Sequence, residues 1–136
     1  TPPAHGSPPP DAETLLALLG LEGPGGYLLL AGTAAATAPA LSALLPGVHL
    51  VAWNPPAGLR ETEAVSLVTA AGVPVRAGSM RGVVLGEPEG RNPGLVVAAV
   101  TAVLPGLRAT GAGPAPTGPE CEVLAEAGGW WVGRRR

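Results

Sequence analysis

Residues 27–56 read YLLLAGTAAATAPALSALLPGVHLVAWNPP, and this stretch constrains the fold more than any other. Its first apolar run ends at Gly32 and is uninterrupted, which is typical of a strand buried on both faces of a parallel sheet. A helix is expected from about Thr37 to Leu45, because Pro39 is tolerated only in the first helical turn. A second apolar run, VHLVAW, follows this helix. The stretch therefore predicts a βαβ unit.

The rest of the chain continues the alternation of strands and helices. Asp11 is a suitable N-cap for a short amphipathic helix that Gly20 ends, and Asn92 followed by Pro93 is a suitable start for a longer helix. Further elements are expected at 59–72 (helix), 73–78 and 81–88 (strands), 92–106 (helix), 106–113 (strand) and 120–136 (a β-hairpin). The pattern predicts an α/β fold, with a mostly parallel sheet, helices on both faces and a C-terminal antiparallel hairpin.

Length and composition limit the classes of protein that this chain fits. Its 136 residues suffice for one domain, placed at residues 11–136 after a flexible proline-rich arm at residues 1–10. A net charge of -2 argues against nucleic-acid binding, and no apolar run is long enough to span a membrane. The single cysteine, Cys121, excludes an internal disulfide and indicates a reducing cytoplasm. Arginine in place of lysine, the absence of glutamine and 17 prolines are compatible with a heat-adapted source.

The order of these elements resembles that of the class I S-adenosylmethionine-dependent methyltransferases, from about residue 12 to the C-terminus. That family has a seven-stranded Rossmann-like sheet ending in an antiparallel hairpin, and a Gly-x-Gly-x-Gly loop after its first strand. LLLAGTAAAT is similar to this strand and loop, RGVVLGEP to the fourth strand, AVLPGLRATG to the turn into the fifth strand, and WWVGRRR to the last strand. The resemblance implies a methyltransferase-like domain with S-adenosylmethionine as its cofactor.

The resemblance also implies which residues would hold that cofactor. Gly32, Thr33 and Ala34 would form the loop under it, and Asn54, after the second strand, would take the ribose position. Ser79 and Met80, in the short segment before the fourth strand, are the side chains suited to adenine contacts.

The chain departs from the family pattern in this region. Ala34 and Ala36 stand where the family has its second and third glycines, and Asn54 stands where it has an acidic residue. Glycine permits positive φ and close approach of the backbone to a ligand, whereas each alanine adds a Cβ where ligand atoms would lie. An amide oxygen also accepts a weaker hydrogen bond than a carboxylate. These differences favour a weakened or absent cofactor site.

Two acidic residues follow the predicted fourth strand in the tetrad GEPE. This is the carboxyl edge of the sheet, where open α/β folds bind ligands, and where the family that this chain resembles often has its catalytic residue. Glu87 is the candidate catalytic residue, and either Glu87 or Glu89 would act as a base or as a substrate contact. The alternative is that both are acids on an exposed loop.

Other reactive side chains fit structural roles. His49 lies within a strand, and with only two histidines in the chain a metal site built on histidine is implausible. Cys121 alternates with acidic neighbours and is expected in the core. Trp53 either packs at the sheet edge or stacks on an adenine. Trp130 and Trp131 are adjacent and point to opposite faces, so a helix, the N-terminal arm or a second subunit must cover the one that does not fill the core.

Two hypotheses of function follow. The first is a small methyltransferase that transfers a methyl group from S-adenosylmethionine to a small acceptor or to one presented by a partner. The second is a non-catalytic protein that has lost cofactor binding and acts as a homodimer or through a partner protein. Binding of a different nucleotide on the same loop is a third possibility.

Overall fold

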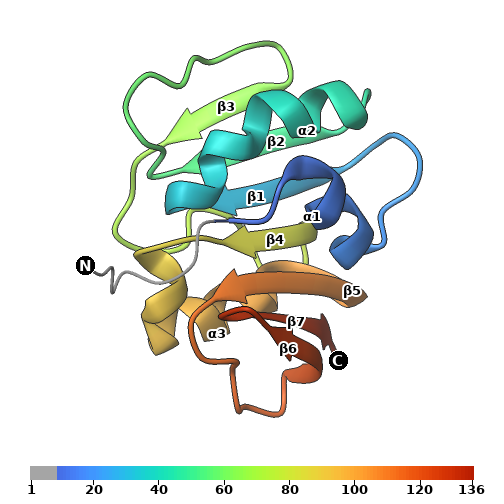
Figure 1. The fold of residues 1–136 in the computed structure, drawn as a ribbon, viewed down its shortest axis with the longest axis vertical. Helices are drawn as coiled ribbons and strands as arrows, with labels where there is room; N and C mark the ends of the chain where they lie inside the picture. The colour runs from blue at the N-terminus through green and yellow to red at the C-terminus, as the bar shows by residue number, and fades with distance from the viewer. Residues whose placement is uncertain (1–8) are drawn as a thin grey trace.

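The computed structural model describes residues 9–136, which form a seven-stranded sheet with helices on both faces (Figure 1). The strand order is β3-β2-β1-β4-β5-β7-β6, parallel from β3 to β5 and antiparallel at β7 and β6. The elements are α1 (Ala12–Leu19), β1 (Tyr27–Ala31), η1 (Gly32–Thr37), α2 (Ala38–Leu44), β2 (His49–Trp53), β3 (Val65–Val68), β4 (Met80–Leu85), η2 (Glu89–Arg91), α3 (Pro93–Ala102), β5 (Val103–Ala112), β6 (Cys121–Ala127) and β7 (Trp130–Arg135). The predicted fold class is confirmed, whereas most of the expected arm at residues 1–10 lies outside the described residues. Within 9–136, no helix combines the length and the apolar character needed to cross a membrane.

The predicted βαβ unit is present. β1 pairs with β2 in parallel, from Tyr27 opposite His49 to Ala31 opposite Trp53, and α2 connects the two strands. Between β1 and α2 the chain forms the 3-10 helix η1, where the sequence indicated a loop. The alanines of this segment favour helical over extended backbone, and two of them are fully buried.

Two apolar cores cover the two faces of the sheet. Along β1, Leu28 and Leu30 belong to the core that contains α1 and α2, whereas Leu29 and Ala31 belong to the core that contains α3. This alternation is the period of two expected of a strand buried on both sides. In Figure 1, α1 and α2 lie in front of the sheet.

The region between β2 and β4 differs from the sequence prediction. The helix expected at 59–72 is absent, because Val65–Val68 forms strand β3 along the outer edge of β2. The backbone groups of β2 on that edge need partners, and the Ala64 carbonyl accepts from Leu50 N over 2.7 Å. The strand expected at 73–78 is also absent. Instead, Ala70, Val73 and Val75 pack irregularly against the α3-side core.

The N-termini of α1 and α3 and the C-terminal hairpin agree with the sequence. The helix expected at 92–106 is shorter than predicted, because it ends at Ala102 and Val103 already pairs with Met80 as the first residue of β5. The side chains of Asp11 and Asn92 accept hydrogen bonds from the first turns of α1 and α3. Trp130 and Trp131 are both buried, the first in the α1-side core and the second in the α3-side core. The prediction of opposite orientations is therefore confirmed, and among the described residues it is the α1-side core that covers Trp130.

Candidate functional site

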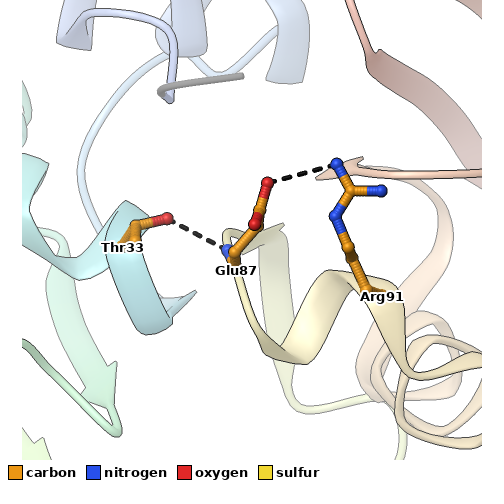
Figure 2. A network of polar contacts seen from close by, with 3 residues as sticks. All are labelled: Thr33, Glu87 and Arg91. Carbon is orange, nitrogen blue, oxygen red and sulfur yellow. Dashed lines mark hydrogen bonds and ion pairs between the residues drawn. The ribbon is translucent and has the colours of Figure 1, made fainter. Parts of the chain in front are cut away.

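The carboxyl ends of β1 and β4 are neighbours, and the segments that follow them are joined directly. Gly86 N donates to the Ala31 carbonyl over 3.0 Å, and Thr33 N donates to the Glu87 carbonyl over 2.9 Å. In return, the Thr33 hydroxyl accepts from Glu87 N over 3.0 Å (Figure 2). These hydrogen bonds fasten the first loop to the turn after β4, at the edge where open α/β sheets bind ligands.

Gly32 is required at this junction by its surroundings. Its φ of 58° lies in the left-handed region that side chains rarely adopt. A Cβ at Gly32 would collide with the Glu87 carbonyl and with the Glu89 carboxylate. Gly86, on the facing turn, is confined in the same way, because a Cβ there would collide with the Ala34 amide and the Thr33 hydroxyl. The glycines therefore allow the two segments of the chain to touch each other.

Asn54 lies at the carboxyl end of β2, as predicted, with its hydrogen-bonding groups already used. Its φ of 51° is a left-handed conformation that asparagine tolerates. Its side-chain NH₂ donates to the Ala70 carbonyl and to Glu89 Oε2, both over 2.9 Å. Its side-chain oxygen accepts from Ala70 N over 3.0 Å. Asn54 therefore links β2, the segment after β3 and the turn after β4.

Glu89 fills the space between the first loop and Asn54. Only 5% of its surface is exposed, although it is an acidic residue. One carboxylate oxygen accepts from Asn54, while the other, Oε1, lies against Gly32 and is buried with no hydrogen-bond partner among the described residues. Burying a carboxylate without a cation is costly, so this position is an uncommon one for a residue without a specific role.

Glu87, the predicted catalytic residue, lies at the carboxyl edge but points to a different neighbour. Its carboxylate forms an ion pair with Arg91 over 3.2 Å (Figure 2). The Arg91 side chain is 42% exposed, and an ion pair at this exposure contributes at most about 1 kcal/mol. The backbone of Glu87, in contrast, forms both hydrogen bonds with Thr33.

Ser79 and Met80 do not share this edge. Met80 begins β4 and Ser79 precedes it, so both residues lie at the amino end of that strand. The length of β4, about 20 Å for six residues at the usual rise of a strand, lies between these two residues and the turn at Glu87. Ser79 donates its hydroxyl to the Arg76 carbonyl over 2.6 Å, and Met80 is buried in the α3-side core. The structure brings together Gly32, Thr33, Ala34 and Asn54 but not these two residues.

The remaining candidates have structural surroundings. Trp53 is fully buried, and its indole N–H donates to the Ala70 carbonyl over 2.9 Å, which agrees with packing. His49 Nε2 lies 2.7 Å from the Ser66 hydroxyl. Cys121 is buried as expected, and burial raises the pKa of its thiol.

Sequence reasoning included Glu89 among the acids of GEPE but did not find its contact with Asn54. The two residues are 35 positions apart, and the spacing within the tetrad does not indicate which acid turns back towards the first loop. The signal available was the position of this acid in the turn that follows a buried strand.

No family model and no curated protein matches the sequence. Solved structures match the fold. A putative methyltransferase from Bacillus halodurans C-125 aligns at a TM-score of 0.57 and 16% identity over 76% of this chain and 52% of that chain. Geranyl diphosphate C-methyltransferase from Streptomyces coelicolor A3(2) aligns at 0.61 and 17% identity over 74% of this chain and 41% of that chain. The chain has a class I methyltransferase-like fold.

A third solved structure also matches the fold. The complex between the Haloferax volcanii Trm112 methyltransferase activator and a putative methyltransferase aligns at a TM-score of 0.59 and 15% identity, over 74% of this chain and 50% of that chain. This methyltransferase-like chain thus spans about half the length of these solved structures.

Some of the similar structures contain the cofactor or its product. The Streptomyces coelicolor enzyme is in complex with S-adenosyl-L-homocysteine, and a geranyl diphosphate methyltransferase is in complex with S-adenosylmethionine. In this methyltransferase-like fold, the residues at the corresponding positions already contact one another. Glu89 occupies the space between Gly32 and Asn54, where the resemblance places the cofactor.

Proposed function

We propose that this chain is a non-catalytic protein with a methyltransferase fold, which acts through contacts with a second copy or with a partner protein. The observation that carries the proposal is the Glu89 carboxylate, which lies against Gly32 and accepts from Asn54. A ligand in the predicted site would have to displace this buried side chain and break its hydrogen bond.

Two further features support the proposal. Asn54 would have to give up its bonds to Ala70 before it could take a ribose hydroxyl, so each new hydrogen bond would replace an existing one. Ala34, where the family has a glycine, packs fully buried in the α1-side core, so the first loop lacks the backbone freedom that a glycine would give it there. Each of these features would weaken the binding of the cofactor at this edge of the sheet.

The experiment is a ligand-dependent thermal unfolding measurement. S-adenosylmethionine, S-adenosylhomocysteine, NAD and ATP are each added at millimolar concentration to the purified chain. We expect no change in Tm with any of them. A ligand present at 100 times its Kd would stabilise the folded state by about 2.7 kcal/mol, so a reproducible rise in Tm would overturn the proposal. Light scattering measures the molar mass in solution, and a mass of twice that of the chain is the result expected if a second copy is the partner.

A second candidate function is methyl transfer, and one observation favours it. Glu89 Oε1 is a buried acceptor without a partner among residues 9–136, and a carboxylate is the group that the family uses for the ribose. Glu89 would then replace, from the turn after β4, the acid that is missing at Asn54.

The variant Glu89→Ala separates the two candidates. If Glu89 closes the site, the variant gains affinity for S-adenosylhomocysteine over the wild type, measured by calorimetry. If Glu89 holds the ribose, the wild type binds and the variant loses affinity. Glu126→Ala, which removes an exposed acid on β6, is the matched control for net charge.

A further inference from the structure

Arginine is unevenly distributed over the molecule. The eight basic residues of the chain are all arginines, and six of them lie near the amino ends of β4 and β5 or at the neighbouring end of β7: Arg76, Arg81, Arg108, Arg134, Arg135 and Arg136. Because β7 runs antiparallel to β5, its last residues reach the edge of the sheet at which β4 begins. We call these six residues the basic edge, which Figure 1 shows on the right, beside the C-terminus.

Acidic residues are fewer around the basic edge than elsewhere. Its acidic neighbours are Glu22 in the loop before β1, and Glu120 and Glu122 at the start of β6. The rest of the described chain has two arginines and seven acidic residues. The basic edge therefore carries a net positive charge on a chain whose total charge is -2.

Three of these arginines are held by groups that carry no charge. The Arg81 guanidinium donates to three backbone carbonyls of the loop at 22–25. Arg108 donates to the Leu18 carbonyl at the end of α1 over 3.1 Å, and Arg135 donates to the first carbonyl of β5 over 2.6 Å. A carbonyl fixes the position of a guanidinium group but leaves its positive charge. These side chains are therefore already ordered for an anionic group, which lowers the entropic cost of binding one.

Two arginines of the basic edge are direct neighbours across strands. Arg108 of β5 and Arg134 of β7 are register partners in the antiparallel pair, and like charges in opposite positions destabilise a sheet. Arg134 pairs with the Glu122 carboxylate over 2.6 Å, with side chains that are 47% and 41% exposed. Among the described residues, that carboxylate is the only one in an ion pair with the basic edge. A further negative charge at this position would relieve the repulsion between the two arginines.

We propose that the basic edge is the surface on which a partner protein docks through a segment rich in glutamate or aspartate. Arginine binds carboxylates through two parallel hydrogen bonds. Arg76 and Arg136 are exposed and have no side-chain hydrogen bond or ion pair within residues 9–136, so they are free to bind such a segment. The acidic excess on the rest of the chain disfavours a long polyanion such as a nucleic acid. The inference rests on the proposed function, because it names the chemistry of the partner protein.

The experiment measures the binding of a fluorescein-labelled octaglutamate peptide to the purified chain by fluorescence anisotropy. We expect saturable binding at about 50 mM NaCl that weakens at about 200 mM NaCl, because salt screens exposed charges. Arg76→Glu and Arg136→Glu should each weaken binding about fivefold, since each replaces an attraction by a repulsion. The matched control is Arg60→Glu, which makes the same change of charge at an exposed position between β2 and β3 and should leave the affinity unchanged.

Several outcomes would overturn the proposal. The first is the absence of peptide binding at low salt, and the second is an equal loss of affinity in Arg60→Glu. Tighter binding of an oligonucleotide of eight thymidines than of the peptide would assign the basic edge to nucleic acid instead. A dimer in light scattering that Arg76→Glu and Arg136→Glu both abolish would assign it to a second copy. The titration contains no cofactor, so its failure is distinct from a rise in Tm with S-adenosylmethionine, which would overturn the proposed function.

Discussion

The substitution Gly32→Ala tests the closed junction between β1 and β4 directly. Alanine at a φ of 58° costs about 1–2 kcal/mol of backbone strain. The new methyl group would also collide with the Glu87 carbonyl and the Glu89 carboxylate, and an overpacked site of this kind costs about 1–3 kcal/mol. The expected loss is therefore about 2–5 kcal/mol in the free energy of unfolding, or about 6–20 °C in Tm at about 3–4 °C per kcal/mol for a chain of this size.

The control for this prediction is Gly78→Ala. Gly78 has a φ of 65°, and a Cβ there would meet only the Arg135 side chain at an ordinary 3.7 Å. This variant should therefore show the backbone strain without the collision. Urea unfolding of both variants measures the difference. Equal losses of stability would show that the turn after β4 does not pack on Gly32 and would refute the closed arrangement.

Three further predictions concern local interactions. Asn92→Ala should lower the free energy of unfolding by about 1 kcal/mol, measured in urea, because the N-cap bond to Leu95 N is lost, whereas Asn92→Asp should retain it. Cys121 should react slowly with iodoacetamide at pH 8 in the folded protein and rapidly in urea, because burial raises the pKa of its thiol and removes thiolate. The hydrogen bond from Arg134 lowers the pKa of Glu122 below its ordinary value of 4.5. The ion pair of these two residues therefore stabilises the fold above pH 4.5, and this stabilisation is lost as the pH falls through the lowered pKa. Arg134→Ala should raise the pKa of Glu122 in an NMR titration, and an unchanged pKa would contradict the pairing.

The sequence patterns of short segments predicted those helices and strands that depend mainly on the residues within them. The βαβ unit follows from two apolar runs and a proline-marked helix start, and the opposite orientations of Trp130 and Trp131 follow from strand geometry alone. The prediction of a helix at 59–72 was wrong. Its charged residues suggest a helix, but Val65–Val68 forms a strand because it pairs with the edge of β2. That edge is a tertiary feature, which a local window does not contain.

The candidate site was predicted in part for the same reason. Gly32, Asn54 and Glu87 each follow a strand, so their common edge could be predicted from parallel topology. Ser79 and Met80 were expected in a loop between strands at 73–78 and 81–88. The strand at 73–78 is absent, and the chain leaves β3 at Val68 and reaches the amino edge of the sheet before Ser79. The contact of Glu89 with Asn54 depends on how a turn folds back, and no residue spacing encodes it.

The mutual hydrogen bonds of Thr33 and Glu87 have a dynamic consequence. The strand order changes direction between β1 and β4, and such a reversal normally leaves a crevice that can open and close. Here two backbone amides and a hydroxyl cross it. The amide protons of Thr33 and Glu87 are therefore expected to exchange with solvent as slowly as those inside the sheet. The edge of the sheet that forms an open ligand crevice in other α/β proteins is, in this chain, a closed and rigid part of the fold.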